Sequence, residues 1–419
     1  MVTKTNNRMI DGATVNVVDF GADPTGALDS TAAIQNALDS GLNVYFAEGS
    51  YSISDSIRVK TSRQNLSMRG ATLVPTSNDF HGIIIEADVD YVVINGGWIN
   101  FPSAGTGNGL ELELGNHNCR FTDMVVNNAN VGFNSPQLSF LQEYVMCRAN
   151  FCNEAFYIKG SRNNGSGNGT TLRMSQCYAN SCVQGFNIVE MNEVNLDTCA
   201  IDNNPSVTGA FVTINLCTTV NITNLAFENE PAITGSRWQG LFIISTQSVR
   251  VNGLKMLFNT ATSSHFIARL SGVRNINFFG LTLKATTMSR FYLSNNLGIN
   301  TRIRRESWTD TDFGDDTSAN NGTFEILNDD VSSAIVAGSI TTTGSSNIPT
   351  GIAGLSQGSV VITLEDSSAY VVPVIRDVFS NGDVAVNFWN LDTGSGDNTT
   401  PYKVHWMAAR NVNPIELVG

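Results

Sequence analysis

The chain has 419 residues, more than one ordinary globular core accommodates, so we expect two domains or one repetitive domain. The formal net charge of −13 disfavours nucleic acid and anionic membranes as partners, because both require clustered Lys and Arg. The sequence has no apolar run long enough to span a membrane and no apolar core of the signal-peptide type near its N-terminus. Abundant glycine (37 residues) and few charged residues (15%) are typical of strands and tight turns.

Residues 1–42 are interpreted as an N-terminal connector and capping segment. The stretch DSTAAIQNALDSG predicts a helix that Asp29 or Ser30 caps and that Gly41 ends. Its apolar positions fall on one side and are Ala33, Ile34, Ala37 and Leu38. We expect this helix to cover the open end of the repetitive segment that follows, because such a fold must be capped.

Residues 43–310 repeat a motif in which a small or polar residue precedes a large apolar one. The similarity is plainest between GAFVTINLCTTVNITNLAFEN, from Gly209, and GLFIISTQSVRVNGLKMLFN, from Gly240. The apolar anchors recur every 23–31 residues and are Ile57, Ile83, Leu110, Phe133, Phe156, Phe186, Phe211, Phe242, Phe266 and Phe291. A second apolar column is formed by Met124, Cys147, Cys177, Cys199, Leu225 and Leu254.

Short alternating strands at this period, separated by Asn and Gly, predict a solenoid. The Leu and Asn pattern of leucine-rich repeats is absent, and propeller blades need a period of about 40 or more. We therefore predict an all-β fold, a right-handed parallel β-helix of about ten coils. Equivalent residues of successive coils then stack about 4.8 Å apart, with the anchors facing inward.

The spacing between the two columns also predicts loops. The chain takes nine residues from Met124 to Phe133 but twelve from Cys199 to Phe211 and seventeen from Leu225 to Phe242. Because strands that stack must keep their length, the extra residues leave the coil as loops at one corner.

Residues 311–419 follow an acidic, turn-rich boundary, TDTDFGDDTSANNG. They contain apolar, β-branched segments such as SVVITLED, AYVVPVIRDVF and DVAVNFWNL. Segments of this kind predict strands, so we expect a C-terminal β-sandwich or trimerisation domain.

Seven cysteines, an odd number, occur without a CxxC pair, and there are only four histidines. This pattern disfavours a zinc site or a disulfide framework and favours buried, reduced cysteines that act as small apolar residues. It fits assembly in a reducing cytoplasm, and we predict no metal site and no cofactor.

The N-terminal stretch VNVVDFGADPTGALDSTAAIQNALDSG resembles the first segment of the pectate-lyase-like β-helix superfamily, which includes polygalacturonases, pectate lyases and bacteriophage tailspikes. The resemblance covers residues 5–55 closely, and the preceding TNNRMIDGATVN looks like the connector of phage tailspikes. The polygalacturonase motifs Asn-Thr-Asp, Gly-His-Gly and Arg-x-Lys are absent from successive coils.

The resemblance therefore implies a tailspike rather than an enzyme of plant polymers. It implies a homotrimer, part of the virion tail and attached to the phage tail or baseplate through its N-terminus. Such proteins bind bacterial surface polysaccharide, and often depolymerise it.

The repeat places acidic residues beside one another. Three residues after the second column come Asn127, Asn150, Asn180, Asp202 and Glu228. Since Asp202 and Glu228 fall on consecutive coils, we predict that they form a catalytic pair, one the acid and the other the base or nucleophile. Asn150 and Asn180 would bind substrate beside them. The alternative is a structural amide ladder that ends in two solvated acids.

The loop after Glu228 supplies further candidates for substrate binding. Glu230, Arg237 and Trp238 lie in NEPAITGSRWQG, where an aromatic ring can stack on sugars and an Arg can bind a carboxylate or hydroxyls. Alternative acids stand near a turn elsewhere in the repeat: Glu190, Glu193 and Asp197, for which surface ion pairs are an equal explanation. Glu154, aligned with Gln184, is a further acid of lower rank.

The sequence thus predicts a tailspike that hydrolyses a bacterial capsule, O-antigen or exopolysaccharide. Two alternatives remain open: an adhesin that binds without cleavage, and a lyase that acts on a uronic-acid polymer. A separation of the two carboxylates near 5 Å favours retention of configuration, and one of about 7–9 Å favours inversion.

Overall fold

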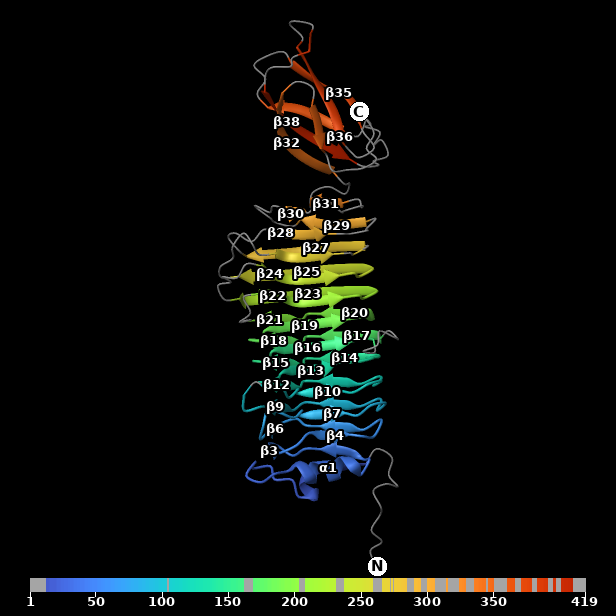
Figure 1. The fold of residues 1–419 in the computed structure, drawn as a ribbon, viewed down its shortest axis with the longest axis vertical. Coiled ribbons are helices and arrows are strands. Elements are labelled where there is room, and N and C mark those ends of the chain that lie inside the picture. The colour runs from blue at the N-terminus through green and yellow to red at the C-terminus, as the bar shows by residue number, and fades with distance from the viewer. Residues whose placement is uncertain are drawn as a thin grey trace, which may run out of the picture. The chain divides into compact units, whose positions relative to one another are not determined.

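The protein is described by a computed structural model, and its chain builds a parallel β-solenoid (Figure 1). The structure describes residues 13–271, except 104, 162–168, 203–207, 231–236 and 259–265. It also describes Val273 and, from Asn275 onward, the backbone of the strands. Among these residues, no helix has the length and hydropathy needed to cross a membrane.

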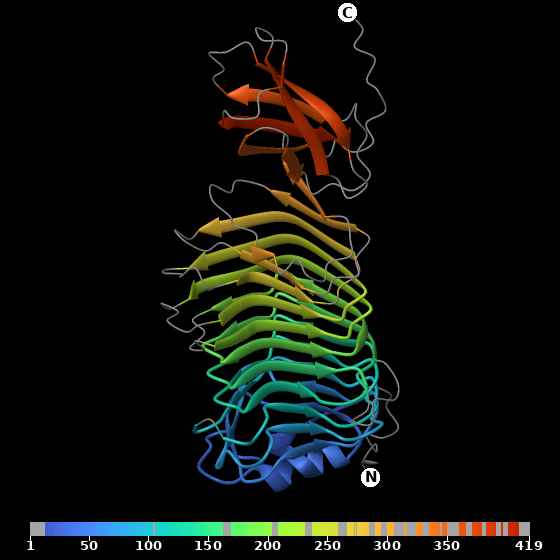
Figure 2. The same cartoon turned by 45° about the horizontal axis from the view of Figure 1, so that its top comes forward.

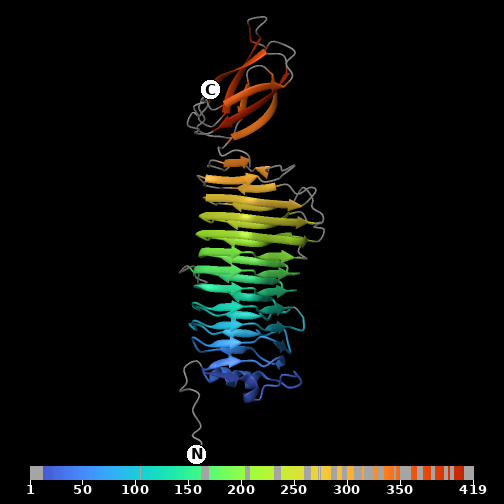
Figure 3. The same cartoon turned by 180° about the vertical axis from the view of Figure 1, so that it is seen from behind.

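Each coil of the solenoid contributes strands to three faces, which Figures 1 and 3 show from opposite sides. The first face is an 11-stranded sheet of β4 (Ile57–Val59), β7 (Ile83–Ile85), β10 (Leu110–Leu112), β13 (Val131–Ser135), β16 (Glu154–Lys159), β19 (Gln184–Val189), β22 (Thr208–Asn215), β24 (Arg237–Ile244), β26 (Phe266–Ser271), β28 (Arg290–Ser294) and β30 (Gly314–Asp315).

The second face stacks β1 (Thr14–Asn16), β2 (Asn43–Tyr45), β5 (Asn65–Ser67), β8 (Val93–Asn95), β11 (Arg120–Thr122), β14 (Gln142–Val145), β17 (Gly169–Ser175) and β20 (Met191–Asp197). The third face stacks β3 (Gly49–Ile53), β6 (Ala71–Pro75), β9 (Trp98–Asn100), β12 (Val125–Asn127), β15 (Arg148–Asn150), β18 (Tyr178–Asn180) and β21 (Ala200–Asp202). In later coils one long strand serves both faces: β23 (Thr219–Glu230), followed by β25 (Ser248–Phe258).

The predicted parallel solenoid is therefore confirmed, with a slightly different number of coils. Up to β24 the chain makes about 8 turns instead of about ten, and β26, β28 and β30 extend the first face beyond them. The corners between the second and third faces depend on single residues with a left-handed backbone, such as Met146 (φ 53°) and Gln176 (φ 54°). One residue in this conformation turns the chain sharply enough for the next strand to begin at once.

The inward side chains of the phenylalanine file follow the prediction as far as Phe186. Phe133, Phe156 and Phe186 stack with ring centroids 4.7 and 5.1 Å apart. The next places in this file belong to Val212 and Leu241, not to Phe211 and Phe242.

The predicted register is thus wrong by one residue in these two coils, and a shift of one residue along a strand moves a side chain to the other face of the sheet. Phe242 pairs with Thr213 and is half-exposed, whereas Phe211 stays buried and contacts Phe227 with ring centroids 6.0 Å apart. Farther on, Phe266 pairs with Gln239 outside the file, and Phe291 returns to it opposite Ala268.

The second apolar column is buried along its whole length, as expected. Its members are Met124, Cys147, Cys177, Cys199, Leu225 and Leu254. All seven cysteines are free thiols and all are buried, which confirms that they act as small apolar residues. Cys177 is typical, since its Sγ lies 3.4 Å from the carbonyl oxygen of Tyr144.

The N-terminal end of the solenoid is covered by α1 (Thr31–Asp39), which follows η2 (Val17–Phe20) and lies across the first coil in Figure 2. The predicted helix is confirmed, and its buried residues are Ile34, Ala37 and Leu38. Ser30 is the N-cap residue but makes no side-chain cap bond. Instead the Asp29 carboxylate accepts a hydrogen bond from the Thr31 N–H at 3.1 Å.

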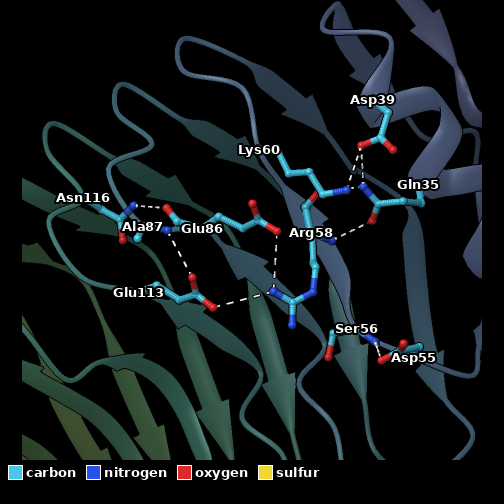
Figure 4. A network of polar contacts seen from close by, with 10 residues as sticks. All are labelled: Gln35, Asp39, Asp55, Ser56, Arg58, Lys60, Glu86, Ala87, Glu113 and Asn116. Carbon is cyan, nitrogen blue, oxygen red and sulfur yellow. Dashed lines mark hydrogen bonds and ion pairs between the residues drawn. The ribbon is translucent and has the colours of Figure 1, made fainter.

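The Gln35 side chain of this helix joins it to the first strand of the first face (Figure 4). The Gln35 amide donates to the carbonyl oxygen of Arg58 at 3.0 Å and accepts from the Arg58 N–H at 2.9 Å. Since β4 is the last strand of its sheet at this end, Gln35 takes the place of the missing neighbour strand. The ion pair between Lys60 and Asp39, at 3.3 Å, adds a second connection.

The second compact unit consists of Arg274–Leu281, Leu297–Trp308 and Asn321–Gly419. It contains parallel pairing of β29 (Asn300–Arg305) with β27 (Asn275–Lys284) and β31 (Phe324–Asn328). Two antiparallel sheets follow, formed by β32 (Ile335–Thr343), β38 (Pro401–Ala409) and β34 (Val360–Glu365), and by β33 (Ser346–Pro349), β36 (Asp383–Asn390), β35 (Val371–Val378) and β37 (Ser395–Gly396). The C-terminal region is β-rich as expected, while the boundaries 42/43 and 310/311 and the trimerising role stay predictions.

Replacement of Gln35 by Ala removes both hydrogen bonds to Arg58 and leaves the polar backbone groups of β4 without their side-chain partner. We expect the free energy of unfolding to fall by about 1 kcal/mol, measured by urea denaturation. Asn36→Ala, at an exposed position of the same helix, is the control and should change stability less. An equal effect of the two substitutions would contradict the capping role of Gln35.

Candidate functional site

The outer surface of the third face carries two files of side chains, one of mixed character and one polar throughout. In each short strand the middle residue is buried and the two flanking residues point outward, so the register aligns the outward residues from coil to coil. One file contains Trp98, Val125, Arg148, Tyr178, Ala200, Ala226 and Lys255. The other contains Asn100, Asn127, Asn150, Asn180, Asp202 and Glu228.

The structure brings together the two predicted catalytic acids. Asp202 in β21 pairs directly with Glu228 in β23, and Asp202 pairs on its other side with Asn180. Below them the amides form a ladder, in which Asn150 Nδ2 donates to Asn127 Oδ1 at 2.7 Å. The predicted juxtaposition of acids and amides is therefore present in the backbone register.

Asp202 is half-buried and is held from the coil below. Tyr178 Oη donates to Asp202 Oδ2 at 2.5 Å, and the Arg148 guanidinium lies 5.0 Å from the centre of the Tyr178 ring. Burial, followed by the bond to Asp202, raises the pKa of the Tyr178 hydroxyl, which therefore keeps its proton for that bond. Asp202 Oδ1 is buried and finds no hydrogen-bond donor among the described residues.

Glu228 is held from the opposite direction. Lys255, in the coil above, donates from Nζ to Glu228 Oε1 at 3.1 Å, and both side chains are partly exposed, at 49% and 35%. The partners of the two acids thus lie on opposite sides of the pair.

The predicted binding residues after Glu228 are placed only by their backbone. Glu230 ends β23, and Arg237 and Trp238 open β24, where they pair with Thr208 and Gly209. The side chains of these three residues, and residues 231–236 between them, lie outside the described part of the chain.

The alternative acids make local surface contacts and lie apart from the Asp202 pair. Glu190 accepts a hydrogen bond from Ser161 and lies 3.9 Å from Lys159 Nζ, while Glu193 accepts from Thr171 at 3.2 Å. Asp197 is exposed at the end of β20. These contacts agree with the surface ion pairs and hydrogen bonds that were the competing explanation.

Two half-buried acids on the outer surface of the first face, Glu111 and Glu154, differ from these because burial raises their pKa values. Burial raises the pKa of Glu111, even though the amides of Asn108 and Asn134 donate to its Oε2 at 2.7 and 2.6 Å. Sequence reasoning did not single out Glu111. The signal was the alternation of strand LEL, which places Glu111 outward between two buried leucines.

The pKa of Glu154 is shifted more strongly than that of Glu111. Burial raises its pKa from 4.5 to about 7, although a hydrogen bond from the Asn187 side chain opposes the shift. Glu154 Oε1 is buried without a donor among the described residues. Sequence analysis ranked this acid low because its alignment with Gln184 indicates only a common position, not its burial. Within the described part of the chain, no three His, Cys, Asp or Glu side chains are grouped as a metal site.

The raised pKa of Glu154 predicts a pH-dependent stability. The folded state holds the Glu154 proton more tightly than the unfolded state, so the contribution of this residue to stability declines as pH rises from about 4.5 to about 7 and is constant above. Glu154→Gln removes the titration, so the melting temperature of this variant relative to wild type should increase across that window. Glu193→Gln, at an exposed acid, is the control. A melting-temperature difference that is constant from pH 4.5 to 7 would contradict the assignment.

Comparison with known proteins agrees with the fold. Residues 14–79 match the family described as rhamnogalacturonase A/epimerase, pectate lyase-like. No curated protein sequence is a match.

Among solved structures, the enzymatically active domain of bacteriophage CBA120 tailspike protein 2 is similar at a TM-score of 0.52 and 11% identity, over 94% of this chain and 79% of that domain. The Streptococcus pneumoniae surface protein and adhesin PfbA is similar at 0.45 and 12%, over 75% and 100%. Because the identity is 11%, the likeness to the tailspike domain shows a common architecture. Residues 14–79 thus resemble the first segment of this family, and the stacked coils share the parallel β-helix architecture of the tailspike domain.

Proposed function

We propose that the chain is the body of a phage tailspike that binds and hydrolyses a bacterial surface polysaccharide, such as capsule, O-antigen or exopolysaccharide. The observation that carries the proposal is the direct pairing of Asp202 with Glu228 on an outward face, with a tyrosine and a lysine on either side. The shared architecture with an enzymatically active tailspike domain supports it at the level of the fold.

The two carboxyl groups divide the work of glycosidic hydrolysis. One donates a proton to the glycosidic oxygen as the bond to the anomeric carbon breaks. The other accepts a proton from water, whose oxygen forms the new bond to that carbon. Strands one coil apart are separated by about 4.8 Å. Because Tyr178 and Lys255 pull the carboxylates in opposite directions, we expect a wider separation, in the range of about 6.5–9.5 Å that leaves room for the water. The proposal is therefore an inverting reaction.

The same face offers groups that suit sugar binding. Trp98, which is 49% exposed, lies in the file of Arg148 and Tyr178, so an apolar ring is available to stack on a sugar. Asn150 and Asn180 present amides next to the acids. Glu230, Arg237 and Trp238 stay proposed ligand contacts from the adjoining corner.

A polysaccharide lyase is the second candidate, and one observation favours it. Lyase chemistry on a uronic acid requires a general base beside a cation that stabilises the developing enolate, and Lys255 Nζ lies 3.1 Å from Glu228. A non-catalytic adhesin would use the same surface for binding alone.

The proposal includes the biological setting that a tailspike implies. The chain would be a homotrimer that attaches to the phage tail or baseplate through its N-terminus, and it would act outside the host after assembly in the host cytoplasm. The buried free thiols support assembly in a reducing compartment.

Substitution of either acid tests the catalytic pair. Asp202→Asn and Glu228→Gln should each lower the rate of polysaccharide cleavage by about a hundredfold or more, on general acid–base grounds, and leave binding largely intact. Glu193→Gln, which removes an exposed acid elsewhere, is the control and should cleave at the wild-type rate. Full cleavage by both variants would exclude the pair.

The products of the reaction distinguish the three candidate functions. Incubation with purified capsules and lipopolysaccharides of candidate hosts should release reducing ends without new ultraviolet absorbance, and proton NMR should show the inverted anomer first. Reducing ends accompanied by the absorbance of an unsaturated uronate would indicate a lyase. Binding without either product would indicate an adhesin.

A further inference from the structure

A comparison of neighbouring coils singles out Glu154. In the next coil the equivalent place belongs to Gln184, which pairs with Glu154 and whose Nε2 donates to Thr213 Oγ1 at 3.1 Å. Glu154 makes the corresponding contact with Asn187, also one coil on. The two side chains therefore occupy the same position, but the amide of Gln184 carries a donor at every pH, whereas the carboxyl group of Glu154 carries one only when it is protonated.

A glutamine at position 154 would suit this environment better than an acid. Glu154 Oε1 is buried and has no donor among the described residues, and an ionised carboxylate with a buried, unpaired oxygen is disfavoured. An amino acid that makes the protein less stable than a closely similar amino acid would is found mainly at functional positions. The acid at this position is thus better explained by a ligand than by packing.

A second buried polar group on this face, the side-chain oxygen of Asn134, also lacks a hydrogen-bond donor among the described residues. Glu111, Asn134, Tyr157, Asn187 and Thr213 form one outward file on consecutive coils. Asn134 is only 7% exposed, yet its Oδ1 finds no donor within the described part of the chain. Glu111 uses Oε2 for both of its amide donors. Buried polar groups without partners in native proteins require an explanation, and a bound molecule is one.

We propose that Glu154, Asn134 and Glu111 form a second ligand site, for an uncharged segment of a polysaccharide, on the outer face of β10, β13, β16 and β19. It lies on a different face from the Asp202 pair, and only the choice of polysaccharide as ligand rests on the proposed function.

The charges near Glu154 favour an uncharged ligand. On its own strand are Tyr157 and Lys159, and Lys159 lies 3.9 Å from Glu190, which follows β19. The flanking strands VGFNS and QGFNIV contribute no ionisable side chain. At Glu111 the charge of His81 lowers the pKa of the acid and that of Glu113 raises it. A sugar segment rich in hydroxyl groups can donate to Asn134 Oδ1 and to Glu111, and the protonated Glu154 can donate to a sugar oxygen.

The test compares wild type, Glu154→Gln and Asp202→Asn, with Glu193→Gln as the matched control. The probes are purified neutral O-antigens and capsules, and the affinity of each protein is measured at pH 6 and pH 8. Because a group that titrates near pH 7 loses about 90% of its proton across this range, wild-type affinity should fall about tenfold from pH 6 to pH 8. Glu154→Gln keeps a hydrogen-bond donor and should show no fall, while Glu193→Gln should behave as wild type.

A second readout reports the site directly. Carbodiimide coupling of an amine at pH 7, followed by mass spectrometry of the peptide that contains Glu154, should be slowed by the bound polysaccharide. The same pH dependence in Glu154→Gln as in wild type would overturn the proposal, and so would coupling at Glu154 that saturating polysaccharide does not slow.

The Asp202→Asn arm separates the two proposals. A variant that cleaves normally but keeps the pH-dependent affinity would refute the catalytic pair and support this site. Loss of cleavage in Asp202→Asn, together with an affinity that is independent of pH in every protein, would support the catalytic pair and refute the second ligand site. Failure of wild type to bind any of the polysaccharides at either pH would overturn both.

Discussion

Hydrogen bonding between identical strands of successive coils is the constraint on which this molecule depends. The strand residues of a coil pair with the coils above and below, so residues about 26 positions apart in the sequence become neighbours at about 4.8 Å. The phenylalanine stack, the buried thiols, the asparagine ladder and the Asp202–Glu228 pair are all consequences of this one geometry.

The same constraint explains how much could be predicted from the sequence. The solenoid, the capping helix and the pairing of Asp202 with Glu228 follow from periodicity, because the short strands around Asn150, Asn180 and Asp202 keep a constant spacing to the column before them. The wrong prediction at Phe211 follows the insertion of extra residues between Cys199 and Phe211. After an insertion either of two adjacent apolar residues, Phe211 or Val212, can take the inward place, and only packing decides between them.

Side-chain contacts were beyond the reach of the pattern for a different reason. Periodicity gives the coil and the face of each residue but not the direction in which its side chain bends. It therefore placed Glu228 beside Asp202 but did not reveal that Tyr178 binds Asp202 from the coil below and that Lys255 binds Glu228 from the coil above. For the same reason it could not show that Glu154 is more deeply enclosed than Glu193 and Asp197, which are exposed.

The contact between Gln35 and Arg58 has a consequence beyond the stability of the helix. A stack of parallel strands ends in unpaired backbone groups, which are a template for a second copy to dock end-on and extend the stack into a fibre. In the first strand of this sheet the polar groups of Arg58 are already occupied by a glutamine from the preceding helix. At Arg58 the cap thus makes the hydrogen bonds that one more coil would make, which hinders a second copy from pairing with this edge of the first face.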